Sequence, residues 1–184
     1  MSITSRAMLT DLAETPGKAE LVGGRIIHSM PTRFRPSIVA ARIYRSLHDH
    51  AAATGQGVAF TDNAGYAVLE LTSGWESFSP DATFYLGPVP EDEMDFIPGP
   101  PTLAVEVRSK KDHGDFAERE MAAKRADYHE AGTPIVWDVD LEARVVRAYR
   151  ADDPDRPTVF GTSQEAEAEP VLRDWRISVD AIFV

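Results

Sequence analysis

The chain has 184 residues, a formal net charge of -11 at pH 7 and no cysteine, which excludes disulfides, thiolate zinc sites and cysteine nucleophiles. No stretch approaches the roughly 18 consecutive apolar residues of a membrane span, and the N-terminus lacks the apolar core of a secretory signal. These features predict a cytoplasmic protein with no membrane partner, and the length predicts one domain over residues 1–184, with its core at about 14–150 and a C-terminal extension over 151–184.

The first half of the chain predicts a hairpin, a long helix and short strands. Two β-runs within residues 18–30 surround Gly23-Gly24, a dipeptide suited to a tight turn. Residues 36–53 have the spacing of an amphipathic helix, which Gly55 and Gly57 end. Runs rich in β-branched and aromatic residues then predict strands at 58–60, 65–71 and 82–86.

The second half predicts a buried strand, a helix and a strand pair. Residues 102–107 are apolar at almost every position, which is typical of a strand covered on both faces. A helix over 115–131 ends at Gly132, strands at 134–140 and 143–149 form a hairpin, and 151–170 is predicted to be irregular. This order predicts an α/β domain with a mixed β-sheet flanked by helices.

Three charged residues lie in settings that do not favour charge. Glu106 is inside the most apolar strand, where a carboxylate is costly unless it is paired or binds a cation. Asp81 follows Pro80 and begins an apolar strand, so its carboxylate can face Glu106 from a neighbouring strand end. Lys124 lies on the more apolar face of the predicted helix and is expected to point toward the sheet.

Two carboxylates and an inward-pointing lysine form a coherent chemical set. Hard oxygen ligands of this kind hold Mg²⁺ or Mn²⁺, and such a metal activates water and offsets charge on a phosphate. Each residue also has a structural alternative. Asp81 can be a turn residue, Glu106 can pair with a surface cation at a sheet edge, and Lys124 can form an exposed pair with Glu120 on its own helix.

Five segments in a fixed order resemble one family, the Uma-type restriction endonucleases, which belong to the PD-(D/E)XK nuclease superfamily. The resemblance extends from about Glu14 to the end of the chain. The segments are 19–26, similar to the family's "ELxDGxL" start, then 79–84, 103–109, Lys124 with Tyr128 and Gly132, and 136–140. Together they are fairly specific for the family, whereas each alone is weak.

The resemblance implies a restriction-endonuclease-like fold and a Mg²⁺- or Mn²⁺-dependent site. Asp81 and Glu106 would be the metal ligands, with the Val107 carbonyl as a third. Lys124 matches the family's helical lysine, and Glu20 matches an early glutamate that reaches the same site. The common superfamily lysine position is held by Arg108, which effectively cannot deprotonate to act as a base.

Several basic residues depart from the family pattern. Ser109-Lys110-Lys111 stands where Ser-Pro-Ser is frequent, and Arg33 and Arg35 stand where a histidine is frequent. These cations either contact phosphates or balance an acidic surface. The net negative charge argues against a broad nucleic-acid surface, but a local positive rim remains compatible with it.

The leading hypothesis is a metal-dependent endonuclease that acts on DNA and pairs as a homodimer. The alternatives are a catalytically silent nuclease fold that serves as an assembly or regulatory module, and a hydrolase of smaller phosphoesters. The apolar C-terminal run 177–184 either covers a dimer interface or completes the core.

Overall fold

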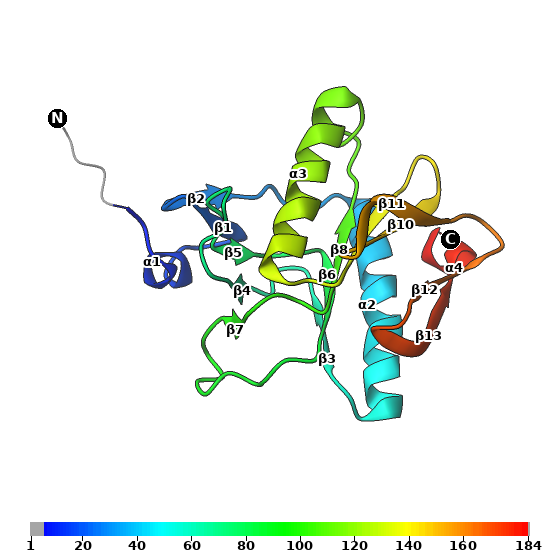
Figure 1. Ribbon diagram of the computed structural model, residues 1–184, viewed down its shortest axis with the longest axis horizontal. Helices are drawn as coiled ribbons and strands as arrows, with labels where there is room; N and C mark the ends of the chain where they lie inside the picture. Colours follow the sequence, from blue (N-terminus) through cyan, green and yellow to red (C-terminus); the bar gives the residue numbers. More distant parts are fainter. Residues whose placement is uncertain (1–5, 184) are drawn as a thin grey trace.

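The computed structural model describes residues 6–183 (Figure 1). Its helices are α1 (Leu9–Ala13), α2 (Phe34–Thr54), α3 (Asp115–Ala131) and α4 (Val179–Phe183). Its strands are β1 (Ala19–Val22), β2 (Arg25–His28), β3 (Val58–Thr61), β4 (Tyr66–Ala67), β5 (Ser77–Phe78), β6 (Ala82–Tyr85), β7 (Ile97–Pro98), β8 (Leu103–Val107), β9 (Ile135–Asp140), β10 (Val145–Arg150), β11 (Asp153–Phe160), β12 (Glu165–Ala168) and β13 (Leu172–Ser178).

A six-stranded mixed sheet organises the described residues, with strand order β11-β10-β9-β8-β6-β3. The central pair β8 and β9 is parallel, and its two strands are joined through α3. The other neighbouring pairs are antiparallel. The predicted α/β class with a mixed sheet and flanking helices is therefore confirmed.

Helices α2 and α3 flank the sheet (Figure 1). Leu103 and Val105 of β8 are fully buried in one hydrophobic cluster with Ile43 and Leu47 of α2. Ala104 of the same strand lies in a second cluster with Tyr128 of α3. Because successive side chains of a strand point to opposite faces, this division shows that β8 is covered on both sides, as its apolar sequence predicts.

Two predictions of local structure were wrong. Only Tyr66–Ala67 of the predicted strand 65–71 is β-structure, and it pairs with β5 and β7 in a small separate sheet. Residues 151–170, predicted to be irregular, contain β11 and β12. Strand β11 contains Pro154 and Pro157 and lies at the edge of the sheet, where a missing backbone donor is tolerated.

The C-terminal run completes the core. Ile177, Val179, Ile182 and Phe183 are buried in the same cluster as α2 and β8, while Val184 lies outside the described residues. These apolar side chains are therefore buried by contacts within the chain itself. Among the helices of the described region, none combines the length and apolar character needed to cross a bilayer.

Candidate active site

Five charged side chains from four segments of the chain meet in one cleft of 470 Å³. Lys18 precedes β1, Glu20 lies on β1, Asp81 immediately precedes β6, Glu106 lies on β8, and Lys124 lies on α3. The structure thus brings together all four side chains that the sequence predicts for the site.

Asp81 is fixed at the junction of two adjacent antiparallel strands. Its backbone N–H donates to the Val105 carbonyl at 3.0 Å, and its Oδ2 accepts the backbone N–H of Val107 at 2.8 Å. Its Oδ1 lies 3.5 Å from Lys18 Nζ. Asp81 therefore joins the segment before β6 to the end of β8, and it is not only a turn residue.

Glu106 points from β8 toward α3. Its Oε1 accepts the Tyr128 hydroxyl at 2.6 Å and lies 3.0 Å from Lys124 Nζ. Its side chain is 15% exposed, so it does not pair with a surface cation at a sheet edge. Tyr128 is fully buried, and burial raises the pKa of its hydroxyl well above the usual value, so this group remains a proton donor to Glu106.

Lys124 reaches into the cleft from α3. Besides Glu106, its Nζ lies 3.6 Å from Glu20 Oε1, and it lies 5.7 Å from the centre of the Trp75 ring. Burial lowers the pKa of Lys124, but the carboxylates of Glu106, Glu20 and Asp81 raise it overall, so the amine stays an ammonium. The exposed pair with Glu120 is therefore not formed.

Glu20 is brought to the site by the β1–β2 hairpin. It is buried, with 5% of its surface exposed, and its Oε1 accepts the backbone N–H of Ser79 at 2.8 Å. Burial raises the pKa of its carboxyl group, and Lys124 acts against that rise. The hydrogen bond ties the hairpin to the segment that carries Asp81.

Lys18 is a site residue that the sequence reading missed. Its Nζ forms ion pairs with Asp62 and Asp81, and these carboxylates raise its pKa against the opposing effect of burial. Lys18 lies two residues before Glu20, the spacing at which side chains of an extended segment share a face. That spacing was the available sequence signal.

Comparisons with known proteins identify the family and the fold of the chain. Residues 7–180 match the Uma2 family model, described as "Putative restriction endonuclease". The chain belongs to the Uma2 family. A crystal structure from Anabaena variabilis ATCC 29413, described as "a putative nuclease belonging to DUF820", matches with a TM-score of 0.73 and 17% identity, covering 95% of this chain and 96% of that chain. At this identity the likeness shows the fold. No curated protein has significant similarity to the chain.

The donor set of this Uma2 protein fits a hard divalent cation. Asp81 and Glu106 each have one carboxylate oxygen bonded to a protein donor other than the lysines, Val107 N–H and Tyr128 hydroxyl respectively. Glu106 keeps its second oxygen for another ligand, and the second oxygen of Asp81 has the 3.5 Å contact with Lys18 Nζ. Among residues 6–183, no group of three or more histidine, aspartate or glutamate side chains is placed to hold a metal ion. A cation here would therefore take few protein ligands and keep several waters, which is the usual state of Mg²⁺.

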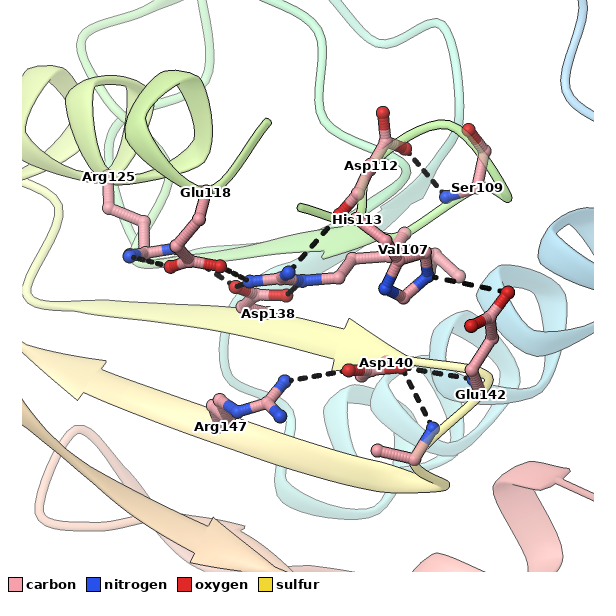
Figure 2. Close-up of polar contacts among 12 residues, drawn as sticks. Val107, Ser109, Asp112, His113, Glu118, Arg125, Asp138, Asp140, Glu142 and Arg147 are labelled. Atoms are coloured by element: carbon pink, nitrogen blue, oxygen red, sulfur yellow. Dashed lines mark hydrogen bonds and ion pairs between the residues drawn. The ribbon is translucent and has the colours of Figure 1, made fainter. Parts of the chain in front are cut away.

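Arg108 has a different role from the lysines in this Uma2 protein. Its Nε and one terminal nitrogen donate to the two oxygens of Asp138, both at 2.6 Å. The same terminal nitrogen reaches Glu118 at 2.6 Å, and Arg125 donates to Asp138 at 2.9 Å. Figure 2 shows Asp138 on β9 facing Glu118 and Arg125 of α3. Arg108 therefore joins α3 to the sheet, and its charge is satisfied internally.

Proposed function

We propose that this Uma2-family protein is an endonuclease that uses Mg²⁺ or Mn²⁺ to hydrolyse phosphodiester bonds in DNA. The family and the fold support a nuclease. The observation that carries the finer proposal is the meeting of Asp81, Glu106 and Lys124 in one cleft. Because one such cleft cuts one strand at a time, the proposal includes a homodimer for cutting a duplex.

Asp81 and Glu106 are the proposed metal ligands, together with the backbone carbonyl of Val107. When bound, the metal would supply an activated water and offset negative charge on the phosphate. Both carboxylates are already oriented, because Val107 N–H fixes Asp81 and the Tyr128 hydroxyl fixes Glu106. Ligands held in this way need little reorganisation when a cation arrives.

Lys124 is proposed as the positively charged side chain that acts on the water and the phosphate. It carries its charge in a partly desolvated cleft, where an ammonium interacts strongly with an oxyanion. From this position it would orient the attacking water and stabilise the charge that develops on the phosphate. Glu20 is proposed as a positioning residue, because it contacts the same Nζ from β1.

The test is Mg²⁺-dependent cleavage of DNA by the wild-type protein and the Lys124→Ala variant. We expect cleavage by the variant to fall by about 100-fold or more, the loss typical when a donor to a developing oxyanion is removed. Circular dichroism checks that the variant is folded. Arg119→Ala is the matched control, because Arg119 is an exposed cation on the same helix.

Undiminished Mg²⁺-dependent cleavage by Lys124→Ala would contradict the proposed mechanism. A second substrate arm separates the alternative chemistry. Hydrolysis of a small nucleotide ester without cleavage of any DNA form would identify a phosphoesterase that uses the same residues on a smaller substrate.

A further inference from the structure

We call two connections that line the cleft its walls, and the carboxylates of Glu20, Asp81 and Glu106 its floor. One wall is the connection from β2 to α2 and includes Thr32 and Arg33. The other is the connection from β8 to α3 and includes Ser109 and Lys111. Glu20, Asp81 and Glu106 line the same cleft and are buried or half-buried, whereas Arg33 and Lys111 are exposed, so a ligand that comes from solvent to these carboxylates can meet both cations.

Among the described residues that line the cleft, each wall contributes one cation that forms no ion pair. Arg33 and Lys111 are exposed, and no carboxylate of residues 6–183 lies within ion-pair distance of either. The other cations that line the cleft differ. Lys18 and Lys124 are paired with floor carboxylates, and Arg108 is paired with Asp138.

Both wall cations are attached to fixed backbone. Arg33 is the N-cap residue of α2, and its carbonyl accepts the backbone N–H of Ser37 at 3.0 Å. On the other wall, Asp112 Oδ2 accepts the backbone N–H of Ser109 at 2.6 Å (Figure 2), and the Asp112 carbonyl accepts Arg108 at 3.2 Å. The backbone beside Lys111 is therefore held by the internal ion network.

The placement of these charges matters because the whole chain is acidic. A protein of net charge -11 repels a polyanion at long range, and the floor adds three carboxylates against two ammonium groups. Two exposed cations that line the cleft and form no ion pair offset this repulsion where a phosphate backbone would bind. Cations that merely balanced an acidic surface would instead form ion pairs with its carboxylates.

We propose that Arg33 and Lys111 bind the backbone phosphates on the two sides of the phosphodiester that reaches the floor. The inference rests on the proposed function, because it assigns a DNA strand to the same cleft. It also divides the basic stretch 108–111 into a structural part, Arg108, and a substrate-binding part, Lys111.

Binding of a short fluorescein-labelled DNA duplex, followed by fluorescence anisotropy over a series of salt concentrations, tests the inference. Ca²⁺ is the only divalent cation, and a gel confirms afterwards that the duplex is intact. The variants are Arg33→Ala/Lys111→Ala and the charge-matched control Arg173→Ala/Arg176→Ala, whose two arginines are exposed on β13 and do not line this cleft.

Each phosphate contact contributes about 0.9 to the slope of log K against log salt. We therefore expect the Arg33→Ala/Lys111→Ala slope to be lower by about 1.8 and the control slope to equal that of the wild type. Equal slopes for all three proteins, equal losses in both variants, or no binding of DNA by the wild type would each overturn the inference.

The same proteins separate this inference from the proposed function. If the slope falls as expected but the wild type leaves DNA uncut with Mg²⁺ and Mn²⁺, the phosphate contacts stand and the nuclease proposal fails. If the wild type cuts DNA but the slope of Arg33→Ala/Lys111→Ala is unchanged, the nuclease proposal stands and the phosphate contacts fail.

Discussion

At the scale of single residues, Asp81 shows how the cleft alters acid–base behaviour. Burial and the nearby charge of Glu106 raise the pKa of Asp81 from 3.8 to about 6, although Lys18 and the Val107 N–H act in the opposite direction. The folded protein thus holds this proton more tightly than the unfolded chain does. The contribution to stability is present below about pH 4 and is lost as pH rises through about pH 6.

This shift predicts the behaviour of Asp81→Asn in metal-free buffer. Between about pH 4 and about pH 8, the free energy of unfolding of the variant should rise relative to the wild type by up to about 3 kcal/mol. Urea denaturation of both proteins at the two pH values, with EDTA present, measures this difference. Titratable groups that do not interact with Asp81 contribute equally in the two proteins and cancel. A difference that does not change with pH, or that changes in favour of the wild type, would show that the Asp81 pKa is not raised.

The residues of the site differ in how far the sequence predicts them. Glu106 and Lys124 stand out because a charge inside an apolar pattern needs an explanation, and Asp81 because it begins an apolar strand. Lys18 lies in an ordinary polar stretch, and only the fold brings Asp62 and Asp81 to it. Lys18 is 44 positions from Asp62 and 63 positions from Asp81 in the sequence. Local sequence patterns do not indicate contacts over such separations.

At the scale of elements, a buried ion network joins β8, β9 and α3. Asp138 has no exposed surface, and its two oxygens accept from both Arg108 and Arg125. Arg125 also stacks on the Tyr149 ring at 4.1 Å. Because Arg125 directly follows Lys124, the network fixes the rotation of α3 that places Lys124 beside Glu106.

Removing Asp138 should therefore destabilise the protein strongly. Asp138→Ala leaves two buried guanidinium groups without this partner, and breaking such a pair costs about 3–5 kcal/mol. Arg6→Ala is the comparison, since it removes the exposed Arg6–Glu70 pair, and exposed ion pairs contribute little to stability. Urea denaturation gives both values, and similar small losses in the two variants would contradict a structural role for the network.

The sequence predicts the long elements better than the short ones. The helix over 115–131 matches α3 at both ends, because Gly132 supplies a left-handed cap. Strand β11 could not be predicted from its own sequence, DPDRPTVF. It forms because β10 offers a free edge, so its cause lies in another part of the chain. Strands β5 and β7 are two residues long and carry too few side chains for a pattern.

At the scale of the whole molecule, the proposed metal site should couple to global stability. A ligand that binds the folded state alone stabilises it by about 2.7 kcal/mol at one hundred times its dissociation constant. For a protein of this size we expect Mg²⁺ or Mn²⁺ to raise the unfolding temperature by about 5–10 °C at that concentration. Differential scanning fluorimetry over a metal titration measures the rise.

Two variants make this titration specific. Glu106→Gln should lose the metal-induced rise because it removes one of the two proposed ligands. Glu120→Gln should keep it, because Glu120 is an exposed carboxylate of α3 that does not line the cleft. If millimolar Mg²⁺ and Mn²⁺ leave the wild type unchanged, the result supports a catalytically silent module built on this fold.

Two lysines lie among the carboxylates of Glu20, Asp81 and Glu106. Their charges bear on the order in which the chain folds and binds the proposed metal. Lys124 and Lys18 neutralise most of the negative charge without any bound ion, so the acidic residues can be brought together while the chain folds. Folding would therefore not have to wait for the proposed metal. A newly made chain would reach its final shape first and bind the proposed cation afterwards.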